Sequence, residues 1–205
     1  MNEMNSTLER IQKMDKRAIT AVPIHPLLSD RWSPRSFDEH ATLSDHDLFA
    51  ILEAARWAPS ANNVQPWRFF VGLRGDEPFN AIQKNLMGFN QSWTPNVSAL
   101  ILIAVTRETP DGKRIRSGSL DAGLAISSMS IQAQALGLHT HPMAGFHHEE
   151  ILASLDAPTN LEALVVLAIG TQAPAENFEG EAYEREIADR TRMPLAEIVL
   201  AGLPA

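Results

Sequence analysis

The alternation of apolar and polar positions predicts two long helices. Between Ser44 (or Thr42) and Pro59, apolar residues recur at helical spacing behind a capping residue and an acidic first turn, which is typical of an amphipathic helix. Residues 119–136 form a second helical stretch, in which small side chains fill the first half and Gly137 follows the last turn. Small side chains let another backbone approach closely, so we expect tight packing on this second helix.

Three apolar segments predict strands. Residues 99–107 and 161–170 are apolar without alternation, which indicates buried strands, and we expect the first of them to be central in a sheet. Residues 67–73 are the third candidate. Because helices and strands are mixed along the chain, the class is α+β or α/β. The remaining predictions are helices at 7–19, 79–86 and 147–155, a loop at 139–146, and a polar tail from Thr171.

Composition narrows the possible functions. A chain of 205 residues with 44% apolar content fits an N-terminal extension at 1–24 followed by one domain at 25–205. The net charge of −8 argues against binding to nucleic acid or to an anionic membrane, and the absence of cysteine excludes thiolate metal sites and disulfides. No apolar segment reaches the roughly 20 residues that span a bilayer, and the N-terminal segment is unlike a signal peptide. We therefore expect a cytoplasmic protein.

The first candidate site is the segment RWSPRSF at 31–37. Arg31 and Arg35 lie on either side of Ser33, and guanidinium and hydroxyl donors suit phosphate oxygens. In an acidic chain, this segment fits a clamp for a phosphate or ribityl group. The alternative is a solvated turn in which both arginines pair with neighbouring acidic residues.

The second candidate is the amide-rich segment APSANNVQPW at 58–67, between a predicted helix and a predicted strand. Side-chain amides both donate and accept hydrogen bonds, so they suit the edge of a heteroaromatic ring. Ordinary turn chemistry, in which Asn and Pro end the helix, is the alternative.

The third candidate is the pair Arg190 and Arg192 near the C-terminus. Residues two apart in an extended segment point the same way, so both side chains could bind one dianion. The alternative is a charged, exposed tail.

Together these segments resemble the FMN-dependent nitroreductase family. RWSPRSF resembles its R-x-S-x-R-x-F motif, APSANNVQPW its P-S-x-x-N-x-Q-P-W, DAGLAISSMSIQAQALGL its small-residue helix, and HPMAGF the loop before its penultimate helix. The order and spacing match from about His25 to Val199. Each motif is weak alone, whereas four in this order are specific.

The resemblance implies an α+β fold in which helices cover both faces of a central sheet, assembled as an intertwined homodimer with FMN at the interface. It implies an NAD(P)H oxidoreductase that reduces nitroaromatic, quinone or similar small acceptors by ping-pong hydride transfer. The cofactor would carry the redox step, so no side chain is expected to be catalytic. The alternative is a flavin-binding storage, sensor or partner protein with little turnover.

The resemblance also implies where the cofactor is bound. Arg31 would contact the phosphate and Arg35 the ribityl and pyrimidine end, while residues 59–63 would reach FMN from the other subunit. Residues 142–145 would run beside the flavin ring, and the C-terminal arginine pair would complete the phosphate site. The expected set is Arg31, Trp32, Ser33, Arg35, Pro59, Ser60, Ala61, Asn63, Pro142, Met143, Ala144, Gly145, Arg190 and Arg192.

The chain departs from this family pattern at two positions. Some members carry an Asn and a Lys before the central strand, whereas the segment NQSWTPN at 90–96 has no Lys. Trp32 stands where Arg or His is frequent.

Other residues with chemical potential fit simpler roles. The histidines within 139–148 match no standard ligand spacing, so we expect packing and helix-end hydrogen bonds rather than a metal site. The alternative for His139 and His141 is a position at the substrate mouth. Trp67 and Phe69 lie on a predicted strand and are expected in the core or at an interface. Trp93 and Phe89 lie in a predicted loop and are the candidates for the substrate side.

Overall fold

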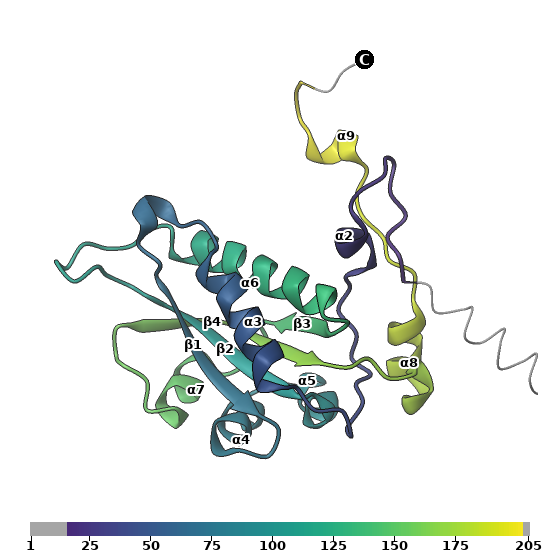
Figure 1. The fold of residues 1–205 in the computed structure, drawn as a ribbon, viewed down its shortest axis with the longest axis horizontal. Helices are drawn as coiled ribbons and strands as arrows, with labels where there is room; N and C mark the ends of the chain where they lie inside the picture. Colours follow the sequence, from purple (N-terminus) through teal and green to yellow (C-terminus); the bar gives the residue numbers. More distant parts are fainter. Residues whose placement is uncertain (1–15, 203–205) are drawn as a thin grey trace, which may run out of the picture.

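A four-stranded antiparallel sheet forms the centre of the molecule (Figure 1). The computed structural model describes residues 16–202. The strand order is β1-β2-β4-β3, so β2 and β4 lie inside the sheet; β2 is almost entirely buried, and so are residues 166–170 of β4. The strands are β1 (Trp67–Leu73), β2 (Ala99–Thr106), β3 (His139–Met143) and β4 (Leu161–Gly170).

One face of the sheet is covered by α3 (Asp45–Arg56) and α6 (Gly118–Ala135). Side chains alternate across a strand, so Ile101 and Ile103 of β2 point to this face. Ser44 begins α3, where its hydroxyl accepts a hydrogen bond from the backbone N–H of Asp47.

The opposite face is covered by α4 (Glu77–Lys84), α5 (Asn90–Trp93) and α7 (His148–Ser154). Leu100 and Leu102 of β2 point to this second core. Both faces of the sheet are therefore covered by helices and shielded from solvent. This accounts for strand sequences that do not alternate between apolar and polar residues.

Two terminal arms, residues 16–30 and 188–202, rise side by side away from the sheet (Figure 1). The first arm contains α2 (Pro26–Asp30), and the second contains α9 (Leu195–Ile198) and follows α8 (Gly180–Ile187). The arms carry apolar side chains that are open to solvent, as Ile19 at 94% and Leu200 at 91% exposure illustrate. Short 3-10 helices complete the fold: η1 (Ala61–Asn63), η2 (Thr94–Asn96) and η3 (Ala175–Asn177).

The α+β class, the helices on both faces and the three strands expected from their apolar sequences are confirmed. Two predictions are wrong: part of the expected loop 139–146 is the edge strand β3, and the polar tail contains α8. The leading helix expected at 7–19 lies mostly outside the described residues, and residues 16–19 are not helical. Within 16–202, no helix combines the length and the apolarity needed to cross a membrane.

Gly72 of β1 lies against the backbone of α4. A Cβ atom at this position would be 2.3 Å from the backbone N of Phe79, so substitution must push the helix off the sheet. We expect Gly72→Ala to lower the free energy of unfolding by about 2–3 kcal/mol in urea denaturation, because overpacking forces backbone shifts. Asn80→Ala, on the exposed side of the same helix, is the control and is expected to change it by less than about 0.5 kcal/mol. Equal stabilities of the two variants would contradict this account.

Candidate functional site

The arginine-rich segment 31–37 is held in place through its backbone. The carbonyl of Pro34 accepts a hydrogen bond from Nδ1 of His141, at 2.7 Å. The hydroxyl of Ser36 donates to the carbonyl of Pro174, at 2.6 Å, and Phe37 pairs with Gln172. Strand β3 and the chain after β4 therefore fix the path of this segment.

A third connection comes from Glu186 of α8, whose side chain is fully buried. Its carboxylate accepts hydrogen bonds from the backbone N–H of Arg35, at 3.0 and 3.1 Å, and from that of Ser36, at 3.1 Å. A buried carboxylate needs such donors to offset the loss of hydration. Sequence reasoning missed Glu186, because one Glu in a segment rich in Glu gives no sign that it is buried.

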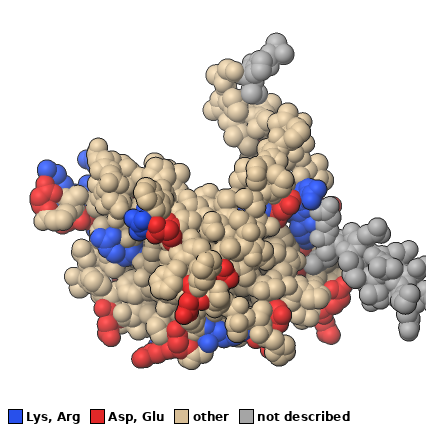
Figure 2. Space-filling model, in the orientation of Figure 1, with Lys and Arg blue, Asp and Glu red and all other residues tan. Residues whose placement is uncertain are grey.

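Three arginines from two distant segments form a cationic cluster, defined here as Arg31, Arg190 and Arg192. Burial lowers the pKa of the half-buried Arg31 guanidinium, and the charges of the other two arginines lower this pKa further. Among residues 16–202 no carboxylate raises the pKa of Arg31, since the nearby Asp30 pairs with Arg17 at 3.0 Å, whereas the charge of Asp30 does raise the pKa of Arg190. Figure 2 shows basic side chains gathered at the base of the arms, whereas acidic side chains line the lower edge of the molecule.

Arg190 also joins the two arms. Its Nη1 donates to the backbone carbonyls of Lys16 and of Ser29, the latter at 2.7 Å. The ammonium of Lys16 lies 5.1 Å from the ring centre of Trp32, whose side chain is buried beneath it. Within the described chain, Arg192 makes only a local hydrogen bond, to the carbonyl of Thr191. Its guanidinium is therefore more available to a ligand than that of Arg190.

Residues 142–145 span the end of β3 and the turn that follows, next to the arginine-rich segment through His141. Pro142 and Ala144 are exposed, and the carbonyl of Gly145 accepts a hydrogen bond from the backbone of Met87, at 2.9 Å. A Cβ atom on Gly145 would lie 3.3 Å from Nδ2 of Asn90, so this amide lies directly beside the turn.

The amide-rich segment is not part of this grouping within one chain. Residues 59–63 follow α3 and lie at the opposite end of the molecule from the arms (Figure 1). Asn62 and Asn63 adopt φ values of 51° and 55°, and the backbone N–H of Ala61 donates to Oδ1 of the buried Asp121, at 3.2 Å. One chain therefore separates the expected site residues into two groups at opposite ends.

The expectation that Trp93 faces substrate is wrong. Trp93 is 1% exposed and stacks on Phe37, with ring centres 5.8 Å apart. Phe89 is half-buried beneath the guanidinium of Arg185, at 5.7 Å. Trp67 is a core residue, as predicted.

The histidines take part in packing. His141 is buried against Pro34 and Trp93, and Nδ1 of His148 is 3.0 Å from the carbonyl oxygen of Ala163. Among residues 16–202, no group of three His, Asp or Glu side chains is arranged to hold a metal ion.

The buried His141 predicts a pH dependence of stability. Burial lowers its pKa from 6.5 to about 4, and the charge of Arg35 also lowers it, against the raising effect of the Pro34 hydrogen bond. Between these two values the unfolded chain binds the proton and the folded chain does not. The free energy of unfolding is therefore expected to fall as pH drops from 7 to 4, by about 3 kcal/mol from this group.

Urea denaturation across this pH range measures the effect. His141→Gln, which keeps a donor for the Pro34 carbonyl, is expected to flatten the pH dependence. His40→Gln, at an exposed position, serves as the control and is expected to leave it unchanged. A wild-type slope in His141→Gln would contradict the assignment.

Comparisons with known proteins identify the family of this chain. The sequence model described as the Nitroreductase family matches residues 28–77 and 73–171. A crystal structure described as an oxidoreductase containing FMN is 36% identical, with a TM-score of 0.85 over 92% of this chain and 96% of that chain.

Two relatives whose names state an activity illustrate the similarity in sequence. The Major NAD(P)H-flavin oxidoreductase of Aliivibrio fischeri is 28% identical over 188 residues, which is 80% of this chain and 85% of the relative. The Oxygen-insensitive NADPH nitroreductase of Helicobacter acinonychis is 38% identical over 77 residues, 38% of this chain and 36% of the relative. The family match extends over most of the sheet and its helices, and the chain belongs to the nitroreductase family.

Proposed function

We propose that this protein is an FMN-dependent NAD(P)H oxidoreductase that reduces small acceptors such as nitroaromatics or quinones. The observation that carries the proposal is the cationic cluster of Arg31, Arg190 and Arg192, which has no compensating carboxylate at Arg31 although the chain has a net charge of −8. A phosphate dianion supplies the missing negative charge and matches guanidinium donors.

The other expected site residues near the cationic cluster suit the ribityl chain and the flavin ring of FMN. The hydroxyl of Ser33 and the half-buried Arg35 would lie along the ribityl chain and the pyrimidine, and residues 142–145 offer backbone groups to the ring. Bound FMN would supply the redox chemistry, accepting hydride from NAD(P)H and reducing the acceptor. A cation near the pyrimidine stabilises negative charge there, which favours the reduced cofactor. Glu186 keeps the backbone beneath Arg35 in place.

The functional unit of this proposal is a homodimer. Residues 59–63 lie too far from the cationic cluster to share a cofactor with it within one chain, so a second copy would have to supply them. Large exposed apolar side chains on α3, α6 and both arms support this assembly, because such surface is unfavourable in water. They include Phe49, Trp57, Leu120, Leu124, Val22 and Ile198.

The small residues of α6 divide between two roles in this proposal. Ala122 and Ala125 are buried against the core beneath α3, whereas Gly123 and Ser127 are exposed. A Cβ atom on Gly123 would meet nothing within 4 Å in one chain, which leaves room for the backbone of a second copy.

An absorption spectrum of the purified protein tests the function. We expect flavin bands that bleach on anaerobic addition of NADPH or NADH and return when a quinone or nitroaromatic is added. Bands that persist with both reductants would contradict the oxidoreductase and favour a flavin-binding protein without turnover. A protein without bands after incubation with FMN would contradict flavin binding.

Arg192→Ala tests the phosphate site. Loss of a charge-assisted contact is expected to weaken FMN binding at least about tenfold, measured by quenching of flavin fluorescence. Riboflavin lacks the phosphate, so its affinity is expected to stay within about twofold of wild type. Lys113→Ala removes the same charge from an exposed position in a different segment and is the matched control. An equal loss for both flavins would contradict a phosphate contact.

A further inference from the structure

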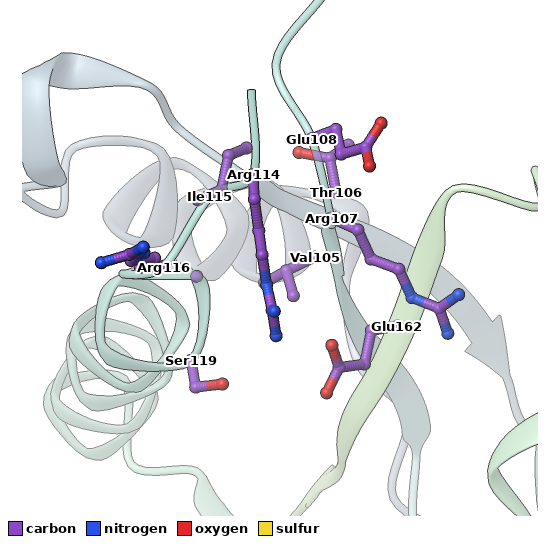
Figure 3. A pocket seen from close by; sticks show the side chains of 10 residues that line it. Val105, Thr106, Arg107, Glu108, Arg114, Ile115, Arg116, Ser119 and Glu162 are labelled. Carbon is purple, nitrogen blue, oxygen red and sulfur yellow. The ribbon is translucent and has the colours of Figure 1, made fainter. Parts of the chain in front are cut away.

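A cavity of about 750 Å³ opens at the end of β2 (Figure 3), at the opposite end of the molecule from the arms (Figure 1). It lies between the end of β2, residues 108–116, the first turn of α6 and the start of β4. The flavin site proposed above uses none of its residues. Its lining is rich in charge, and three of its side chains are arginines: Arg107, Arg114 and Arg116.

These arginines are unpaired. Within residues 16–202, the guanidinium groups of Arg107, Arg114 and Arg116 have no hydrogen-bond or ion-pair partner, although Glu108 and Glu162 also line the cavity. By contrast, the neighbouring Lys113 pairs with Asp111 at 2.7 Å. Three cations without partners around one cavity attract an anion locally, although acidic residues outnumber basic ones in the chain, 25 to 17.

The side chains that enter the cavity present both donors and an acceptor. Figure 3 shows the guanidinium of Arg114 directed into the middle, the hydroxyl of Ser119 pointing in from α6, and the carboxylate of Glu162 facing them from β4. Arg107 and Arg116 lie at opposite sides, and their guanidinium groups point away from the middle of the cavity. Guanidinium and hydroxyl groups donate to phosphate oxygens, whereas a carboxylate accepts from sugar hydroxyls. A carboxylate in this position disfavours a bare phosphate and favours a phosphate ester that carries hydroxyl groups.

We propose that this cavity binds the phosphorylated ribose of a nucleotide. The phosphate would contact Arg114 and Ser119, with the flanking arginines adding charge, and a ribose hydroxyl would donate to Glu162. The ribose phosphate could belong to the 2′-phosphate end of NADPH or to a nucleotide with a 5′-phosphate.

The cavity is connected to residues 59–63 through a buried carboxylate. Asp121 is 2% exposed and accepts hydrogen bonds from the hydroxyl of Ser117, at 2.8 Å, and from the backbone of Ala61, at 3.2 Å. Ser117 lies between Arg116 and the first turn of α6. A nucleotide bound here would thus lie close to the segment that the proposed homodimer needs for its flavin site.

Isothermal titration of the full chain with saturating FMN tests the proposal. The probes are adenosine 2′,5′-bisphosphate, AMP and inorganic phosphate, none of which can reduce a flavin. We expect at least one nucleotide to bind more tightly than inorganic phosphate. Tighter binding of the bisphosphate identifies the NADPH type of ligand, and equal or tighter binding of AMP identifies a 5′-nucleotide.

Variants assign the binding to the cavity. Arg114→Ala is expected to weaken nucleotide binding at least about tenfold, and Glu162→Gln to remove the preference for nucleotide over inorganic phosphate. Lys113→Ala is the matched control and is expected to stay within about twofold of wild type. Arg114 is exposed, so its variant is expected to unfold at the wild-type temperature.

Two results would overturn the proposal. One is the absence of saturable nucleotide binding, and the other is wild-type affinity in Arg114→Ala. Binding that is lost in Arg192→Ala but kept in Arg114→Ala belongs to the cationic cluster and also overturns it. Because heat rather than flavin absorbance is measured, failure to bind FMN would not hide a nucleotide site here.

Discussion

The burial of Glu186 is the constraint on which the candidate flavin site depends. A carboxylate without solvent is costly unless donors surround it, and here the donors are backbone N–H groups of Arg35 and Ser36. This contact ties α8, which follows the sheet in sequence, to a segment that precedes it. The guanidinium of Arg35 takes no part in these hydrogen bonds, although the charge of Glu186 raises its pKa. The backbone N–H of Arg35 thus holds the segment in place, while its guanidinium supplies the positive charge.

The two ends of the molecule share one physical property, which is a local group of arginines in a chain that is acidic overall. At the base of the arms, Arg31 is half-buried and its neighbours are other arginines. At the cavity beside the end of β2, the arginines are exposed and the carboxylate of Glu162 faces Arg114. The first environment suits a strongly charged group, and the second suits a group that combines charge with hydroxyls. Local charge arrangement thus matters more than the net charge of −8.

Much of the fold was predictable, because β2, β4, α3 and α6 each bury a continuous apolar pattern that local sequence encodes. The edge strand β3 was not, since its sequence, HTHPM, is polar and becomes a strand only through pairing with β4. The sequence motifs of the candidate site could be recognised, but the contacts between their residues could not be predicted. The burial of Trp93 and Glu186 depends on contacts between distant segments, which a single sequence does not contain.

The hydrogen bonds from Arg190 to Lys16 and Ser29 have a consequence for biosynthesis. The four strands of the sheet all precede Thr171 in the sequence, so the sheet can pair before residues 186–192 have been synthesised. The N-terminal arm acquires its partner only when residues 186–192 emerge. The contacts that assemble the cationic cluster would therefore form only after the sheet has paired.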